Sequence, residues 1–326
     1  MRLFLAVLFA GILALGCKNN KGFPDVSKIK ADVQIKRFDK DFFAIDTNHL
    51  AATVGSVRSK YPSFLPIYFE YFSPIDYMVR EQGMSYERAV TEYYRNMRSL
   101  FDSVQLRFPT LSSLDKDLET HFKYVKYYFP DFKIPAVLTS VESLNPENPL
   151  EIYGTTYYHD TLVISLQMFM GKNFPVYDPE QYPEYLRKRF EKQYIVPNSI
   201  RAISSDIYPD SSEGAPMIEQ MIEKGKQWYL MSKFMPESPD SLITGYTGNQ
   251  TEWCKSNEGM IWATINQNEN LYSIDQSTVQ TYIGQAPFTQ TLPHGNSGEG
   301  APGNIGQWLG WRIIQSYAEK NPRLSI

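Results

Sequence analysis

Few residues of this chain could bind a metal ion or act as a nucleophile. The 326 residues include four histidines and two cysteines. A zinc peptidase carries His-Glu-x-x-His on one helix, because positions i and i+4 place both imidazoles on one face. No histidine here has another within four residues, and the chain lacks the Gly-x-Ser-x-Gly turn that exposes a catalytic serine. The sequence therefore predicts no metal, no cofactor and no catalytic residue.

The remaining polar and aromatic groups each have a plainer explanation than catalysis. Glu219 and Glu223 are four residues apart, as on the solvated edge of an amphipathic helix. Cys254 has no histidine within twenty residues, which favours a buried structural thiol. The glycine-rich stretch 295–300 follows no predicted strand, so a loop is favoured over a phosphate cradle. The 23 tyrosines and five tryptophans could line a sugar-binding surface, but most fall on helix faces with apolar neighbours.

Composition excludes two broad classes of protein. Hydrophobic residues make up 42% and aromatic residues 14% of the chain, which is too apolar for an intrinsically disordered protein. The formal net charge is −4 at pH 7, and no cluster of basic residues gives the footprint of a nucleic-acid-binding surface. We therefore expect a folded protein with no nucleic-acid partner.

The N-terminus has the pattern of a lipoprotein export signal. A basic start precedes an apolar run over 3–16, which at 14 residues is shorter than the roughly 20 that a membrane-spanning helix needs. The run ends in small residues directly before Cys17, as in the lipobox of bacterial lipoproteins, although Ala14 stands where leucine is usual. An ordinary secretory signal is the alternative. We expect a signal peptide at 1–16, a lipid anchor and tether at 17–30, and a single globular domain at 31–326.

Acylation of Cys17 makes a lipid bilayer the first expected partner, because several acyl chains together hold a protein to a membrane stably. The tether at 18–22 is basic and rich in amides. Surface-exported lipoproteins of the Bacteroidota resemble one another in carrying acidic residues at this place. We therefore expect a lipid-anchored outer-membrane protein that faces the periplasm.

The elements that must position any site are mostly helical. Apolar residues recur with a helical period through 84–108, and the β-branched run 134–140 indicates a strand. Ser112 and Asp115 fit a capping box at the start of a second helix. An α+β fold follows, mostly helical, with a small N-terminal to mid-chain sheet and a helical C-terminal half. Further strands are expected near 33–38 and as a hairpin over 153–167, and further helices at 178–194, 197–207, 215–235, 252–272, 275–283 and 303–318.

Three C-terminal segments carry a family resemblance: 257–262, which reads Asn-Glu-Gly-Met-Ile-Trp; 268–273; and the glycine-rich and tryptophan-rich 301–314. With the lipobox, they resemble the gliding-motility lipoprotein family GldB over essentially the whole mature chain. The resemblance implies an outer-membrane lipoprotein tied to gliding and type IX secretion, with envelope, motility or secretion proteins as partners. It implies no settled biochemical activity.

The same layout is similar to predicted zinc peptidases with a zincin-type fold. In those proteins a helix with His-Glu-x-x-His precedes a second helix with a glutamate ligand. Here 194–206 takes the place of the metal helix and contains no histidine. Glu223 matches the second-helix acid, but one carboxylate cannot hold zinc without imidazole or thiolate neighbours. The resemblance therefore implies a zincin-like fold without the hydrolysis.

Our leading hypothesis is a non-catalytic pseudo-peptidase that acts as a binding or assembly factor through its former cleft. Alternatives are an assembly factor without a ligand pocket, a glycan- or peptide-binding envelope lipoprotein unrelated to motility, and a zinc-independent hydrolase. Gly306 and Gly310, at i and i+4, are expected to let the last helix approach a neighbour closely. The residues expected near the cleft are Arg201, Glu223, Trp228 and Trp311.

Overall fold

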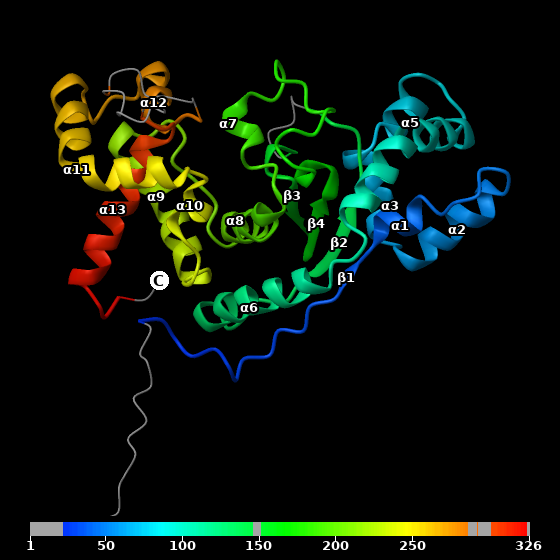
Figure 1. Cartoon of the computed structure of the whole chain (residues 1–326), viewed down its shortest axis with the longest axis horizontal. Helices are drawn as coiled ribbons and strands as arrows, with labels where there is room; N and C mark the ends of the chain where they lie inside the picture. Colours follow the sequence, from blue (N-terminus) through cyan, green and yellow to red (C-terminus); the bar gives the residue numbers. More distant parts are fainter. Residues whose placement is uncertain (1–21, 146–150, 286–291, 293–300, 325–326) are drawn as a thin grey trace, which may run out of the picture.

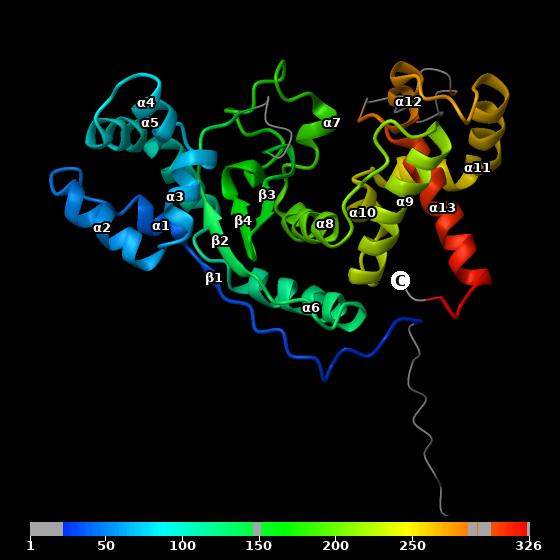
Figure 2. The ribbon, with the colours of Figure 1, turned by 180° about the vertical axis from the view of Figure 1, so that it is seen from behind.

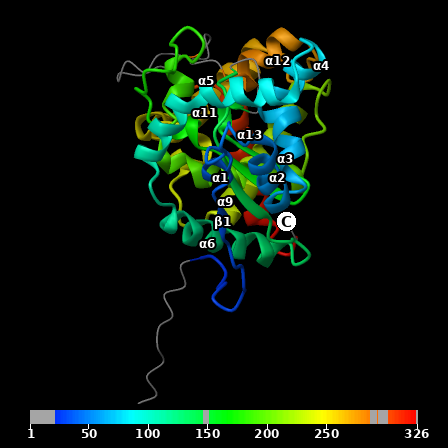
Figure 3. The same ribbon diagram turned by 90° about the vertical axis from the view of Figure 1, so that its right-hand side faces the viewer.

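The computed structural model describes residues 22–145, 151–285, 292 and 301–324. Its elements form three groups along the long axis: N-terminal helices at one end, a sheet in the middle, and C-terminal helices at the other end (Figure 1). The reverse view shows the same order (Figure 2). Seen along the long axis, the N-terminal helices lie in front of the sheet and the C-terminal helices behind it (Figure 3).

The first group comprises α1 (Phe38–Phe42), α2 (Leu50–Lys60), α3 (Phe64–Ile67), the π-helical turn η1 (Tyr68–Phe72), α4 (Ile75–Arg80) and α5 (Tyr86–Arg107). The middle group adds α6 (Ser112–Tyr128), the short turns η2 (Glu151–Tyr153), η3 (Leu166–Phe169) and η4 (Lys192–Tyr194), α7 (Glu184–Arg187) and α8 (Ile195–Ile207). The last group is α9 (Met217–Phe234), α10 (Asp240–Thr244), α11 (Gly248–Asn268), α12 (Gln276–Ile283) and α13 (Ile305–Lys320).

The sheet has four strands in the order β1-β2-β4-β3: β1 (Ile35–Lys36), β2 (Ala136–Ser140), β3 (Thr155–Tyr158) and β4 (Thr161–Ser165). β1, β2 and β4 are parallel, and β3 pairs antiparallel with β4, with Thr155 opposite Ile164. The two central strands are nearly fully buried, as continuous apolar runs predict for strands covered on both faces. α8 packs on β3 and on α9, so it joins the sheet to the C-terminal helices.

Aromatic packing explains much of the tyrosine and phenylalanine content at the N-terminal end. Phe38 is fully buried and meets the rings of Phe64 and Tyr68 edge-on, with centroids 4.8 and 4.7 Å away. The Tyr68 hydroxyl is buried and donates to the Val141 carbonyl at 2.7 Å, which connects this cluster to the sheet. Buried tyrosines keep a polar end that needs such a partner.

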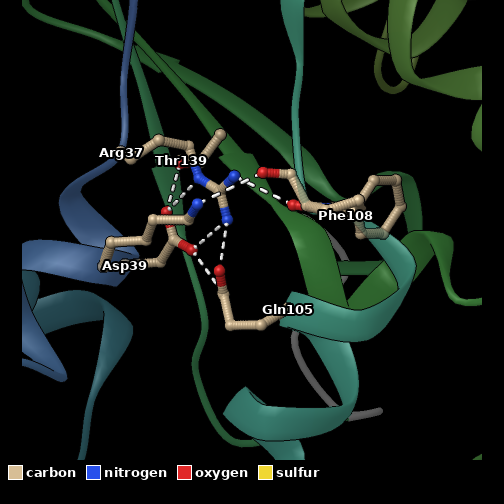
Figure 4. Close-up of polar contacts among 7 residues, drawn as sticks. Arg37, Asp39, Gln105, Phe108 and Thr139 are labelled. Atoms are coloured by element: carbon tan, nitrogen blue, oxygen red, sulfur yellow. Dashed lines mark hydrogen bonds and ion pairs between the residues drawn. The ribbon is translucent and has the colours of Figure 1, made fainter.

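A buried ion pair ties β1, α1, α5 and β2 together (Figure 4). The Arg37 guanidinium donates to both carboxylate oxygens of Asp39, at 2.9 and 2.7 Å, and to the Phe108 carbonyl at 2.9 Å. Asp39 is 1% exposed, and it also accepts from Gln105 at 2.9 Å and from the Thr139 hydroxyl at 2.5 Å. The partners come from the junction of β1 and α1, from the end of α5 and from β2, so this network fixes how these three segments meet.

The prediction of a mostly helical α+β fold is confirmed, and among the described residues all four strands precede residue 166. The hairpin turns at His159 and Asp160, both with positive φ. The predicted helix at 178–194 is wrong, because Pro179 and Pro183 interrupt it and only α7 and η4 are helical. The helix expected at 252–272 begins four residues earlier, as α11.

The predicted capping box at the start of α6 is also wrong. The residue before the helix is Leu111, whose side chain caps no backbone N–H. Asp115 instead accepts a hydrogen bond from the backbone N–H of Ile35 at 3.2 Å, so its carboxylate ties α6 to β1. The helices α2 and α4, which the sequence reasoning did not predict, complete the N-terminal group.

Candidate functional site

The candidate site begins with Arg201 on α8. This helix is held against the sheet side of the fold by Asn198, whose amide donates to the Tyr153 carbonyl at 2.6 Å. The Arg201 guanidinium lies over the Tyr153 ring, 4.9 Å from its centroid, and donates to the Ile243 carbonyl at 3.3 Å. Its Nε is buried and has no hydrogen-bond partner among the described residues. Arg201 is therefore a partly buried cation, and the described residues around it use only part of its hydrogen-bonding capacity.

A second arginine approaches the same tyrosine from the segment between α7 and η4. The Arg189 guanidinium lies 5.8 Å from the Tyr153 ring centroid and donates to Gln285 at 3.1 Å. Gln285 in turn donates to the Tyr153 hydroxyl. Gly245 has φ +73° and leaves room for the arginine stem, since a Cβ there would lie 2.9 Å from the Arg189 Cδ.

These side chains line a cavity of about 250 Å³, which we call the arginine cavity. α9 contributes Lys224 and Trp228 to its lining, and α13 contributes Gln307, whose amide donates to the Lys224 carbonyl at 2.8 Å. The carboxylate in the described lining is Asp210, which pairs with Lys224 at 2.9 Å. Both arginines lack an ion-pair partner among the described residues.

The pKa shifts of the cavity residues report its positive field. Burial raises the pKa of Tyr153, but the charges of Arg201 and Arg189 and a hydrogen bond from Gln285 outweigh burial, and the net pKa is lowered. Burial lowers the pKa of Arg201, and the like charge of Arg189 lowers it further, against the opposing effect of Tyr153. A phenol whose pKa falls despite burial lies in a strongly positive environment.

The four residues expected at the cleft divide into two pairs. Arg201 and Trp228 line the arginine cavity. Glu223, on the same helix as Trp228, instead pairs with Lys226 at 2.7 Å, and its side chain is 13% exposed. Trp311 packs against Trp228 inside the contact of α9 with α13, with ring centroids 6.0 Å apart.

The sequence reasoning missed Tyr153, Arg189, Gln285 and Gln307. These residues come from four separate segments, and no local spacing connects them. Arg189 also lay inside the stretch that was expected to form a charged helix. A family alignment, in contrast to one sequence, offers a signal for such dispersed residues.

Glycines bring α13 against α9. A Cβ at Gly310 would collide with the Met221 carbonyl oxygen, and one at Gly306 would lie 2.9 Å from the Met221 Cγ. On the α9 side, a Cβ at Gly225 would collide with the backbone of Gly310. This close approach sets the distance between the two helices that carry Trp228 and Gln307.

In the described part of the chain, no three or more histidine, cysteine, aspartate or glutamate residues lie together so that they could hold a metal ion. Cys254 is fully buried, as predicted. Burial raises the pKa of its thiol, which disfavours the reactive thiolate.

A larger apolar groove of about 710 Å³ lies between the end of α6, α9 and α13. Its lining is rich in aromatic residues, among them Tyr128, Tyr208, Tyr229 and Tyr317. It contains none of the four residues expected at the cleft.

A comparison with protein families matches residues 19–326 to the family described as gliding motility protein GldB. The chain belongs to this family. The GldB match covers both the helices around the arginine cavity and the segment 301–314, which contains the start of α13. No curated protein and no solved structure matches the chain.

The chain is therefore a member of a family of gliding-motility lipoproteins. Within residues 22–324, as far as they are described, no helix is long and apolar enough to cross a bilayer. Cys17, the expected lipid attachment site, and the signal peptide at 1–16 lie outside the described residues.

Proposed function

We propose that this GldB family member is a non-catalytic binding or assembly factor of the gliding and type IX secretion apparatus, anchored to the outer membrane through Cys17 and facing the periplasm. The family match over residues 19–326 is the observation that carries the proposal. The arginine cavity supports a binding role, because its cations and its aromatic ring have the chemistry of ligand recognition.

We also propose that the chain has a zincin-like fold and descends from a metal-dependent peptidase. α8 takes the place of the metal helix, and its Arg201 faces a cavity together with residues of the following long helix, α9. Glu223, in the place of the second-helix acid, is paired with Lys226. A cleft that has exchanged its metal ligands for cations suits a binding protein descended from a peptidase.

Deletion of the gene tests the role in motility. We expect the deletion strain to lose gliding and type IX secretion, and the intact gene to restore both. A Cys17→Ala gene is expected to restore neither, with the protein displaced from the outer-membrane fraction. A deletion strain normal in motility, secretion and envelope integrity would overturn the proposal.

Metal analysis tests the non-catalytic part separately. The full chain, purified in detergent, is expected to contain no stoichiometric zinc and to cleave no peptide substrate. Stoichiometric zinc together with proteolysis that is lost on Glu223→Ala would show a working peptidase instead.

The apolar groove favours a second candidate, a glycan-binding function, because tyrosine rings are suitable platforms for sugars. Calorimetry with envelope polysaccharides tests it. Binding that weakens on Tyr229→Ala would support this candidate, and failure of every polysaccharide to bind would remove it.

A further inference from the structure

The arginine cavity carries more positive charge than its described lining neutralises. Its cations are Arg189, Arg201 and Lys224, and its carboxylate is Asp210. Asp210 is already engaged, since it pairs with Lys224 at 2.9 Å and accepts from the Ser212 hydroxyl at 2.6 Å. Three positive charges against one negative charge leave an excess of two. Arginine is rarely buried without a partner, so the excess favours the binding of an anion.

Unused hydrogen-bond donors accompany this charge. The Nε of Arg201 is buried without a partner in the described part of the chain, and its Nη2 has an acceptor only at 3.3 Å. The indole N–H of Trp228, which also lines the cavity, has no partner among the same residues. A buried donor left without an acceptor costs about 1–3 kcal/mol. An oxyanion would supply acceptors for these groups.

We infer that the arginine cavity binds a phosphate group, with the guanidinium groups of Arg189 and Arg201 as its main contacts. The inference rests on the proposed binding function of the same site. A phosphate monoester carries about −1.5 to −2 charges at pH 7, which matches the excess of two, whereas a carboxylate supplies one. The guanidinium fork also fits phosphate oxygens in a bidentate manner.

The size of the cavity limits what the phosphate belongs to. At about 250 Å³ it is smaller than the roughly 300–1,000 Å³ of pockets that enclose a drug-sized ligand. It therefore takes free phosphate, or the phosphate end of a larger molecule whose remainder lies outside. The lowered pKa of Tyr153 agrees with the positive field that such a group requires.

Calorimetry on the full chain, purified in detergent at constant ionic strength, tests the inference with inorganic phosphate and with glycerol 3-phosphate. We expect both probes to bind more tightly than acetate, and Arg201→Met and Arg189→Met each to weaken binding at least about tenfold. Arg88→Met removes the same charge from an exposed site on α5 and is expected to leave binding unchanged. Arg201→Lys keeps the charge without the fork and is expected to fall between wild type and Arg201→Met.

The two probes separate the sources of the phosphate. Tighter binding of glycerol 3-phosphate indicates a phosphate carried on a larger molecule, and tighter binding of inorganic phosphate indicates the free ion. Failure of both to bind, or equal weakening by Arg88→Met, overturns the inference.

A motility assay keeps this inference distinct from the proposed function. Cells that carry Arg201→Met and glide normally, while the purified variant has lost phosphate binding, would retain the ligand and remove the cavity from the motility role. Cells that stop gliding, although wild-type protein binds neither probe, would retain the role and reject phosphate as the ligand.

Discussion

Two arginines in this molecule lie in opposite circumstances. Arg37 donates to a carboxylate, a glutamine and a backbone carbonyl, and its partner Asp39 also accepts hydrogen bonds from two further side chains, Gln105 and Thr139 (Figure 4). Arg201 has a tyrosine ring, one long hydrogen bond to a carbonyl, and a like charge nearby. Both side chains are largely or partly enclosed by protein, so burial alone does not distinguish them.

The difference shows how one residue type can serve the fold in one place and a ligand in another. The ion pair of Arg37 is complete within the chain, and any added group would compete with existing partners. Arg201 belongs to a region whose hydrogen-bonding capacity exceeds what the described chain supplies. Complete polar networks specify a structure, and incomplete ones in cavities are where binding sites are found.

The largest expected effect is on stability at the complete network. Arg37→Met would leave the Asp39 carboxylate, whose side chain is 0% exposed, without its cation. Breaking a buried pair on one side costs about 3–5 kcal/mol. Urea unfolding should show this loss in the free energy of unfolding, and a variant as stable as wild type would mean that Gln105 and Thr139 suffice to hold Asp39.

The next effect concerns the wall of the arginine cavity. Gly310→Ala would push the new methyl group into the Met221 carbonyl and separate α13 from α9, at a cost of about 1–3 kcal/mol. Because Gln307 and Lys224 line the cavity from those two helices, phosphate binding should weaken as well. Calorimetry and thermal unfolding measure the two effects.

Gly259→Ala is the matched control for that prediction. Gly259 lies within α11, and a Cβ there meets nothing within 4 Å. The alanine should stabilise the protein by up to about 1 kcal/mol through helix propensity alone. Destabilisation of equal size at both glycines would show that close helix contact is not the reason for Gly310.

Arg201→Met sharpens the comparison with Arg37, because a small stability effect is expected from the same substitution. The lost cation–π contact with Tyr153 costs about 0.5–1 kcal/mol, and relief of repulsion from Arg189 offsets it. The free energy of unfolding, measured without phosphate, should therefore stay within about 1 kcal/mol of wild type. A loss as large as that of Arg37→Met would assign Arg201 a structural role.

Sequence reasoning succeeded where the evidence is local and periodic. The helical period of 84–108 and the β-branched run of 134–140 gave α5 and β2 to within two residues, because burial of one face imposes those patterns. It failed at 178–194, where prolines and buried aromatic side chains override a helical charge pattern. Tertiary contacts decide such segments, and one sequence does not display them.

The arginine cavity was only partly predictable for the same reason. Arg201 and Trp228 were expected there through the family layout, and both line it. Tyr153 and Arg189 come from irregular segments whose positions depend on the whole fold. Glu223 was placed by analogy with a zinc ligand, but without imidazoles nearby its carboxylate is free to pair with Lys226 on the next turn.

The smallest expected effect is a pH dependence at Tyr153. Its pKa in the folded protein lies below the value near 10 of the unfolded chain, so its contribution to stability is fully present above pH 10 and is lost as pH falls through the folded pKa. The stability difference between wild type and Tyr153→Phe should therefore widen in favour of wild type as pH rises toward 10.

Tyr157→Phe is the opposite case, since burial and the charge of Asp160 raise the pKa of Tyr157 to about 12. Above pH 10 that variant should gain on wild type, and chemical unfolding at pH 7 to 10.5 would compare them. If Tyr153→Phe followed Tyr157→Phe, the positive field of the arginine cavity, on which the contrast with Arg37 depends, would be refuted.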